Sequence, residues 1–442
     1  MTIFRAYDIR GIYPAELDEK MAFKIGAAIG SLFGGTICVG CDVRTSSPGL
    51  KKELISGILS AGADVVDIGV VTTPMVYFAV AYYGHDGGVN VSASHNPKEY
   101  NGFKICKAGG VCLSYETGLN KIEELTKTGK LKKGKGRLEK KNIEADYIDF
   151  VTKNVKLKNP LKVVIDAGNG AAFDIGPKIF KRLGFEVVKL FCEPDGRFPN
   201  HQPDPIKKET LRDLQKKVLL EKADLGIAYD GDGDRVGVVD ERGNVIDNNK
   251  IFGLLVKNVL ETYPKSKIVH EVLVSKIVED MIKRFGGVPV ISKVGHSYVQ
   301  QKVIDENCIF GGEYSGHYFF KESYGYDDGV FASIKIAELL NKGSISALAK
   351  TIPEYITSEA YRPFCEDKIK FAVVDRLKNR LKGHNIIDID GVRCVFDKSW
   401  FIIRASNTGP QLVVRWEAED KKEFERIGHF VKEQLNSVGI KL

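Results

Sequence analysis

Short apolar segments alternate with amphipathic segments along most of this chain, and that alternation limits the folds it can adopt. Residues 36–42 (TICVGCD) predict a buried strand. The next segment places five apolar residues on one helical face, namely Leu50, Leu54, Ile55, Ile58 and Leu59. Residues 64–71 predict another strand, and Thr73 and Pro74 are typical of a helix N-cap and first helical residue. Such alternation indicates a layered α/β protein.

The pattern begins again twice and changes near the C-terminal end. New units open near residue 161 (LKVVIDAGNGAA) and residue 266 (SKIVHEV), whereas the chain from about residue 358 predicts helices around an antiparallel sheet. At roughly 100–200 residues per domain, 442 residues suggest three or four domains. We predict three similar α/β modules with mixed sheets and a C-terminal α+β module around a central cleft. The predicted domains are 1–145, 146–247, 248–357 and 358–442.

The composition is that of an ordinary globular protein, with 43% hydrophobic and 28% charged residues. No stretch approaches the roughly 20 apolar residues that span a bilayer, and the first residues, MTIFRAYDIRG, carry charges where a signal peptide is apolar. We therefore expect a cytoplasmic protein without a membrane partner. The closest pair among the eight cysteines, Cys38 and Cys41, has no second C-x-x-C or paired histidines, so a buried strand is the favoured interpretation.

The formal net charge of +7 raises the question of nucleic-acid binding. The densest basic run, residues 127–141, contains no interleaved aromatic residues on which bases could stack. We interpret it as a solvated connector and expect no nucleic-acid partner. A mildly basic protein suits a small anionic ligand, because positive potential draws phosphate esters toward a cleft.

The loop at residues 91–105, VSASHNPKEYNGFKI, places Ser94 beside His95 and Asn96, with Lys104 ten residues further on. A serine hydroxyl needs a base or a metal to become an effective nucleophile. Taken alone, the same residues favour a turn that satisfies local backbone groups.

The segment at residues 224–240 places Asp230, Asp232 and Asp234 directly after an apolar strand, alternating with glycines. Three carboxylates so close repel one another unless a hard divalent cation neutralises them. The next residue, Arg235, offers a guanidinium fork for a phosphate. The loop resembles an EF-hand, but Arg235 stands where that loop requires glycine and the flanks predict strands. A solvated acidic turn is the remaining alternative.

Two further loops carry polar side chains suited to a sugar phosphate. In GGEYSGHYFF (311–320), Glu313, Ser315 and His317 alternate and would share one side of an extended loop. In RASNTGP (404–410), one arginine stands with several short polar residues, a set that suits a phosphate dianion: Arg404, Ser406, Asn407 and Thr408. In isolation, a hairpin turn would be the favoured interpretation of the first loop and a simple turn that of the second.

Together and in this order, the four loops resemble the signature loops of the α-D-phosphohexomutase superfamily, most closely its bifunctional phosphomannomutase/phosphoglucomutase branch. The resemblance covers nearly the whole chain. Further segments similar to that family are FRAYDIRG (4–11), FPNHQPDP (198–205), KVGHS (293–297) and YDDG (326–329).

The resemblance implies a role for each matching residue. It implies that Ser94 is a phosphoserine and that Ser94, Asp230, Asp232 and Asp234 bind Mg²⁺. The residues implied to line the reaction centre are Tyr7, Arg10, His95, Lys104, Arg235, Lys293 and His296. Those implied to hold the sugar hydroxyls are Glu313, Ser315 and His317, and those implied to hold the distal phosphate are Arg404, Ser406, Asn407 and Thr408.

The mechanism implied by the resemblance interconverts hexose 1-phosphates and hexose 6-phosphates of mannose, glucose or both. Phosphorylated Ser94 gives its phosphoryl group to a hexose phosphate, a hexose 1,6-bisphosphate turns over in the cleft, and the serine takes back the other phosphate. Lys104 or His296 would carry the hydroxyl proton, and the sequence does not choose between them. The oligomeric state is also undetermined by the sequence.

Two positions depart from the family pattern. Gly409 stands where many relatives have a polar residue. Some bifunctional relatives place a lysine after the strand that opens the third module, whereas this chain has Leu273 there and Lys276 nearby. A contact from that lysine is therefore not assumed.

Three alternatives remain at this stage. A phosphoglucosamine mutase is the closest, although we would expect a sequence nearer RPSGT in the fourth loop. A metal-dependent sugar-phosphate phosphatase would use Asp230 as its nucleophile and make Ser94 dispensable. A catalytically silent sugar-phosphate sensor would need no metal-bound nucleophile beside Arg235.

Overall fold

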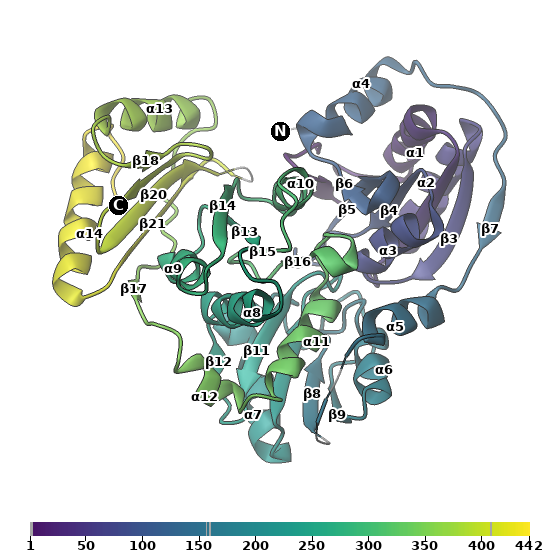
Figure 1. The fold of residues 1–442 in the computed structure, drawn as a ribbon. Coiled ribbons are helices and arrows are strands. Elements are labelled where there is room, and N and C mark those ends of the chain that lie inside the picture. Colours follow the sequence, from purple (N-terminus) through teal and green to yellow (C-terminus); the bar gives the residue numbers. More distant parts are fainter. Residues whose placement is uncertain (1–2, 156, 159–160, 407–408) are drawn as a thin grey trace.

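The computed structural model describes residues 3–155, 157–158, 161–406 and 409–442, and folds into four modules, each built on its own sheet. Figure 1 shows the first module at the right, the second at the bottom, the third in the centre and the fourth at the left. The predicted fold class, α/β modules with mixed sheets and a C-terminal α+β module, is confirmed.

The first module contains a seven-stranded sheet in the order β1-β5-β4-β2-β3-β7, with β6 beside β5. Strands β4, β2, β3 and β7 run parallel, and β5 runs antiparallel to both of its neighbours, β4 and β1. The strands are Ile9–Ile12 (β1), Thr36–Cys41 (β2), Asp64–Val70 (β3), Gly87–Val91 (β4), Tyr100–Lys107 (β5), Val111–Cys112 (β6) and Leu138–Lys140 (β7). The helices are Glu19–Phe33 (α1), Ser47–Ser60 (α2), Thr73–Tyr83 (α3) and Asn120–Thr128 (α4).

The second module has a five-stranded mixed sheet in the order β12-β11-β10-β8-β9. Its strands are Lys162–Asp166 (β8), Glu186–Leu190 (β9), Leu225–Tyr229 (β10), Val236–Asp240 (β11) and Val245–Ile246 (β12). Its helices are Glu144–Thr152 (α5), Ile175–Arg182 (α6) and Arg212–Glu221 (α7). Strands β10 and β11 form the hairpin that carries the aspartate loop.

The third module has a four-stranded mixed sheet in the order β14-β13-β15-β16. Its strands are Lys267–Glu271 (β13), Val288–Ser292 (β14), Phe310–Gly312 (β15) and Tyr318–Phe320 (β16). Its helices are Asn248–Thr262 (α8), Lys276–Arg284 (α9), His296–Asp305 (α10), Gly329–Leu339 (α11) and Ile345–Ala349 (α12). Helix α11 also packs on β10 and β11, which joins the third module to the second.

The fourth module is an antiparallel sheet in the order β17-β21-β20-β19-β18. Its strands are Ile356–Thr357 (β17), Ile386–Ile387 (β18), Val392–Val395 (β19), Ser399–Ala405 (β20) and Leu412–Ala418 (β21). Its helices are Lys370–Arg380 (α13) and Lys421–Asn436 (α14). Because β17 precedes residue 358, this sheet extends into the predicted third domain, and the domain boundaries stay a prediction.

One local expectation was wrong, and one segment forms more regular structure than was expected. Helix α3 has Thr72 as its N-cap and begins at Thr73, so the Thr73 hydroxyl is free for another bond. Part of the basic connector is a strand, because residues 138–140 pair in parallel with β3 and form the edge of the first sheet.

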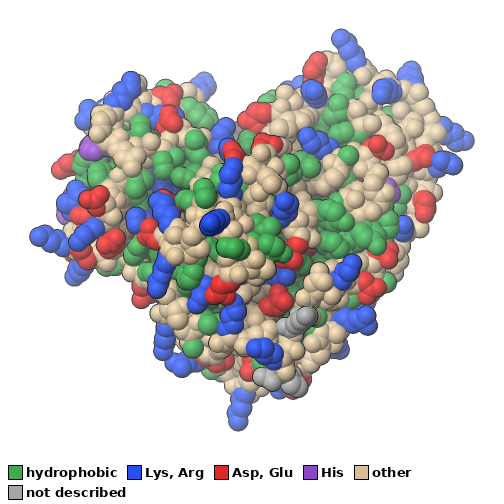
Figure 2. Space-filling model, viewed as in Figure 1, with side chains coloured by type: hydrophobic (Ala, Val, Ile, Leu, Met, Phe, Trp, Pro, Cys, Tyr) green, Lys and Arg blue, Asp and Glu red, His purple; other side chains and the backbone are tan. Residues whose placement is uncertain are grey.

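Figure 2 shows the outline indented between the fourth module and the first, with basic and acidic side chains interspersed over this face. Among the described residues, no helix is both long and apolar enough to cross a bilayer.

Candidate active site

Ser94 follows β4 and is held in an unusual backbone conformation. Its φ is +50°, in the left-handed region that residues with a side chain seldom adopt. The buried guanidinium of Arg44 stabilises this turn by donating to the carbonyl oxygens of Ser94 and Asn96, at 2.7 and 2.6 Å. Arg44 therefore fixes the backbone of the turn that carries Ser94. Sequence reasoning missed Arg44, which lies fifty residues earlier.

The Ser94 hydroxyl faces the aspartate loop of the second module. Its Oγ donates to Oδ2 of Asp230 at 2.6 Å and lies 3.2 Å from Nδ1 of His95. A Cβ added at Gly231 would stand only 2.3 Å from the Ser94 carbonyl oxygen. Glycine at position 231 is therefore what lets the two loops approach this closely.

The three predicted metal ligands are brought together. Asp230, Asp232 and Asp234 are all fully buried, and each offers a carboxylate oxygen within 4.8 Å of the others. Burial raises the pKa of Asp230 well above its ordinary value, and the neighbouring carboxylates raise it further. Oδ1 of Asp232 is buried and has no hydrogen-bond partner in the part of the chain that the structure describes. An all-oxygen set with excess negative charge and an unpartnered oxygen fits a hard divalent cation.

Lys104 and Thr73 hold the aspartates in place. The Lys104 ammonium lies 2.9 Å from Oδ2 of Asp232 and also contacts Asp234. The Thr73 hydroxyl donates to Asp232 at 2.5 Å. Lys104 was predicted to line the reaction centre, whereas the bond from Thr73 went unpredicted because Thr73 was assigned to the helix cap.

His317 stands between two carboxylates and links the third module to the aspartate loop. Its Nε2 lies 3.2 Å from Oδ1 of Asp234 and its Nδ1 lies 2.5 Å from Oε2 of Glu313. Burial disfavours the charged imidazolium, but Asp234 and Glu313 outweigh it and raise the His317 pKa to about 10. Ser315 Oγ lies 2.9 Å from the same Nδ1, so the three residues of this loop share one side as predicted.

A cleft of about 520 Å³ opens above these groups. The predicted residues that line it are Tyr7, Arg10, Ser94, His95, Lys104, Arg235, His296, Glu313, Ser315 and His317. Arg10 donates to Asn96 at 2.8 Å and pairs with Asp8 at 2.5 Å. Arg235 Nε lies 3.1 Å from His317 Nε2, which places its guanidinium beside the aspartates. A volume of this size is ordinary for a small-ligand site.

Two acidic residues of this region were not predicted. Oδ2 of Asp327 lies 3.4 Å from Nδ1 of His296 and 3.7 Å from Nε2 of His317. Glu271 lines the cleft, and burial together with Glu313 raises its pKa to about 7. Asp327 belongs to the YDDG segment noted in the sequence, but nothing there showed which histidine it would meet.

Not every predicted residue lies at the cleft. Lys293 is exposed, with its ammonium 5.4 Å from the centre of the Tyr298 ring. Arg404 and Ser406 are buried on the fourth module and do not line the cleft. Arg404 Nε pairs with Asp390 at 3.0 Å, while its Nη2 is buried and has no hydrogen-bond partner among the described residues. The other two predicted phosphate ligands, Asn407 and Thr408, lie outside the described residues.

Where some bifunctional relatives have a lysine after the strand that opens the third module, this chain presents an apolar side chain to the cleft. Leu273 lines the cleft, and Lys276 instead pairs with Asp280 through its ammonium at 2.8 Å. No lysine from this segment therefore faces the described part of the cleft.

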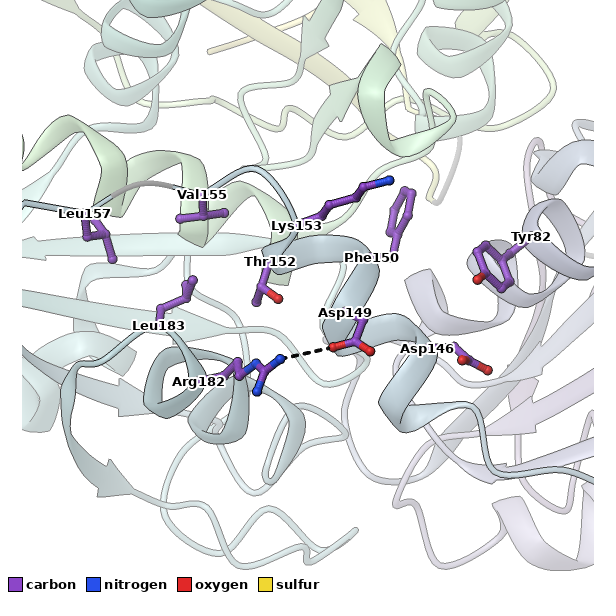
Figure 3. Close-up of a pocket in the computed structure, with 10 residues that line it drawn as sticks. All are labelled: Tyr82, Asp146, Asp149, Phe150, Thr152, Lys153, Val155, Leu157, Arg182 and Leu183. Atoms are coloured by element: carbon purple, nitrogen blue, oxygen red, sulfur yellow. Dashed lines mark ion pairs between the residues drawn. The ribbon is translucent and has the colours of Figure 1, made fainter.

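A second, larger hollow of about 850 Å³ lies elsewhere, beside helices α5 and α6 (Figure 3). None of the predicted site residues lines it. Its ion pair, Arg182 with Asp149 at 3.6 Å, joins two largely exposed side chains. The hollow has no chemistry comparable to that around Ser94.

Four models of known domain families match the chain in consecutive order. They are described as the phosphoglucomutase/phosphomannomutase alpha/beta/alpha domains I, II and III, at residues 1–133, 145–243 and 247–355, and its C-terminal domain, at 365–434. The chain belongs to the phosphoglucomutase/phosphomannomutase family. The resemblance inferred from the four loops is thereby confirmed.

Curated relatives align over nearly the full length of the chain. The phosphomannomutase/phosphoglucomutase of Pseudomonas aeruginosa PAO1 is 39% identical over 446 residues, covering 99% of this chain and 96% of its own. The phosphoglucomutase of Neisseria gonorrhoeae is 38% identical, covering 98% and 97%. The phosphomannomutase of Vibrio cholerae is 36% identical, covering 98% and 97%. The predicted enzyme class is confirmed: the chain is a phosphohexomutase.

Solved structures share the fold. A phosphoglucomutase/phosphomannomutase family protein of Burkholderia thailandensis superposes with a TM-score of 0.93 at 34% identity, covering 99% of this chain and 98% of its own. The N-acetylphosphoglucosamine mutase of Aspergillus fumigatus, solved with GlcNAc-6P and magnesium, has a TM-score of 0.56 at 15% identity, covering 99% and 96%. The latter likeness supports the fold alone.

Proposed function

We propose that this phosphohexomutase moves phosphate between the 1- and 6-positions of glucose and mannose phosphates, with Ser94 as the phosphoryl carrier. The observation that carries the proposal is the 2.6 Å contact between Ser94 Oγ and Asp230 Oδ2. It supports the proposal because the Ser94 hydroxyl of the first module lies against three buried carboxylates of the second.

The ion that best suits these carboxylates is Mg²⁺, which prefers oxygen ligands. Asp230, Asp232 and Asp234 would hold it, with Ser94 as the fourth protein ligand. When bound, Mg²⁺ supplies charge neutralisation for the phosphoryl group during transfer. Arg235 adds a guanidinium at the same place.

The residue that best fits the role of accepting the proton from the attacking sugar hydroxyl is His296. Lys104 is engaged by two carboxylates, whereas His296 lines the cleft and neither of its ring nitrogens has a hydrogen-bond partner among the described residues. Asp327 beside it would stabilise the protonated ring. We therefore propose His296 as the general acid and base, and Asp327 as the residue that positions it.

The sugar would be held by Glu313, Ser315 and the charged His317, and the distal phosphate by Arg404, Ser406, Asn407 and Thr408. Because Arg404 and Ser406 do not line the cleft, we propose that the fourth module closes over the substrate. Closure would also keep water from the phosphoserine while hexose 1,6-bisphosphate turns over.

The test is a coupled assay with glucose 1-phosphate and mannose 1-phosphate, each with Mg²⁺ and a trace of glucose 1,6-bisphosphate, in which free phosphate is also measured. We expect both substrates to form 6-phosphates without free phosphate. Conversion of glucosamine phosphate well above both would overturn the sugar assignment. Release of phosphate in place of isomerisation would favour the phosphatase alternative.

The cytoplasmic location, the absence of a nucleic-acid partner and the domain boundaries stay predictions.

A further inference from the structure

A second group of possible metal ligands lies between the first and third modules. Cys112 is on β6, His296 begins α10, and Asp327 lies between β16 and α11. The Cys112 Sγ, a ring nitrogen of His296 and a carboxylate oxygen of Asp327 lie within 4.8 Å of one another, and all three residues are buried. Among the groups of this kind formed by the described residues, it is the one that contains a cysteine.

The nitrogen and oxygen atoms of His296 and Asp327 lack the hydrogen-bond partners that buried atoms normally have. Both ring nitrogens of His296 and both carboxylate oxygens of Asp327 are buried with no hydrogen-bond partner in the described chain. Asp327 is fully buried and His296 is only 4% exposed. Leaving four such atoms unpaired is costly, which points to a partner that the protein itself does not supply.

The spacing fits one ion. Oδ2 of Asp327 and Nδ1 of His296 are 3.4 Å apart, slightly beyond a good hydrogen bond. Two ligands at about 2.0–2.1 Å from a tetrahedral ion stand roughly 3.3–3.4 Å apart. The backbone around Cys112 is also fixed to α10, because Gln300 accepts from Cys112 N at 2.8 Å and donates to Gly110 O at 2.9 Å.

The ligand types differ from those of the aspartate loop. Three carboxylates suit a hard cation such as Mg²⁺, whereas a thiolate, an imidazole and a carboxylate suit Zn²⁺. Three protein ligands leave a fourth position for water. His296 is the member of the group that also lines the cleft.

We propose that Cys112, His296 and Asp327 form a binding site for Zn²⁺ or a similar thiophilic divalent ion, and that its occupation inhibits the enzyme by withdrawing His296 from the cleft. The thiol proton passes to solvent when the ion binds. Ion binding stands on the geometry above, whereas inhibition rests on the role proposed for His296.

The rival explanation is a plain ion pair between His296 and Asp327. That pair needs no sulfur, so the role of Cys112 separates the two accounts. Cys112→Ala removes the sulfur and leaves the other two ligands in place. Cys106→Ala is the matched control, because Cys106 is also buried and lies opposite Cys112 in the β5–β6 pair.

The first experiment titrates the Mg²⁺-loaded protein with Co²⁺ and follows the absorption of a cobalt–thiolate bond. We expect the band in the wild type and in Cys106→Ala, and its loss in Cys112→Ala. No band in the wild type, or an equal band in Cys112→Ala, overturns the site. Cys112→Ser provides a second variant if the alanine variant does not fold. This readout does not depend on mutase activity.

The second experiment measures inhibition by Zn²⁺ with Mg²⁺ in large excess, which keeps the aspartate loop occupied. Loss of an outer partner of a metal ligand already costs about 10–100-fold in affinity, so loss of the thiolate should raise the inhibitory Zn²⁺ concentration about 10-fold or more. Equal sensitivity of wild type and Cys112→Ala would refute the inhibitory role. A cysteine-dependent cobalt band without inhibition would keep the site but refute the role given to His296.

Discussion

The first three modules and the fourth are built into the molecule in different ways. One continuous hydrophobic core runs through the first three and contains, among others, Phe78, Tyr229 and Phe252. The fourth module has a separate core that includes Phe401 and Val431. The modules that hold the nucleophile, the aspartates and the sugar loop therefore share one packed interior, and the module with the phosphate loop does not.

The fourth module contacts the third through hydrogen bonds and a small apolar cluster. The buried Arg393 donates to the carbonyl oxygens of Val272 and Val274, at 2.8 and 3.2 Å. Arg415 donates to Leu273 O at 3.1 Å. A small apolar cluster around Trp400 completes this contact. The difference teaches that the residues proposed for phosphoryl transfer lie on three modules that share a core. The residues proposed to hold the distal phosphate lie on a module with its own core, which is consistent with the closure proposed above.

The largest effect is expected when a carboxylate is removed from the aspartate loop of the second module. In Asp230→Asn we expect kcat to fall on the order of 10³-fold, because one ligand of the divalent ion is lost. Thermal stability without added metal should hold or rise, because the carboxylates repel one another in the buried site. Asp224→Asn, at the opposite end of β10, is the control and should keep its activity. A stable, fully active Asp230→Asn would contradict the account.

The second prediction concerns His296, the proposed proton carrier, which belongs to the three modules that share a core. In Asp327→Asn we expect kcat to fall about 10–100-fold with little change in KM, because His296 loses the group that positions it and stabilises its charge. Both the magnitude of kcat and its dependence on pH should change, and a purely structural defect would not change the pH dependence. A loss confined to KM would place Asp327 outside the proton transfer.

The third prediction turns to the fourth module. Arg404→Ala should raise KM and lower kcat/KM about 10–100-fold, because it removes a charged grip on the distal phosphate. Steady-state kinetics give the result, with Arg426→Ala, which changes a half-exposed arginine of the same module, as the control. If kcat/KM is unchanged in Arg404→Ala, the fourth module has no part in binding that phosphate.

The smallest effect is expected for stability in the shared core. Asp328 caps α11 and accepts from Tyr147 of α5, so it joins the second and third modules. Burial raises its pKa from 3.8 to about 7. The folded protein therefore takes up a proton here, so this carboxyl favours folding at pH values below 3.8 and opposes it increasingly as pH rises through about 7.

Asp328→Asn keeps the cap and removes the titration. The melting temperature of this variant relative to wild type should rise by roughly a few degrees between pH 4 and pH 8. Asp247→Asn, at the exposed N-cap of α8, should show no such trend. A difference that does not vary with pH would show that the Asp328 carboxyl is not titrating as described.

The sequence predicted the parts of the site that are continuous in the chain. The aspartate loop carries its chemistry within a few residues, so spacing alone was informative there. The segment around Ser94 did not stand alone and was assigned a role only through the resemblance of the four loops together. Residues that act through distant partners were missed, including Arg44 and Asp327. Thr73 was assigned to a helix cap because the sequence does not show that Asp232 lies against it. Lys293 was expected at the reaction centre, but it lies exposed beside Tyr298.

The central claim is that the phosphoryl group passes through Ser94, and the most direct measurement locates it. The protein is incubated with glucose 1,6-bisphosphate, the modified residue is identified by mass spectrometry, and the sample is then chased with glucose 6-phosphate. The account predicts phosphate on Ser94 that leaves during the chase, and a Ser94→Ala variant that is neither labelled nor active. Turnover by Ser94→Ala, or phosphate on Asp230 instead, would contradict it.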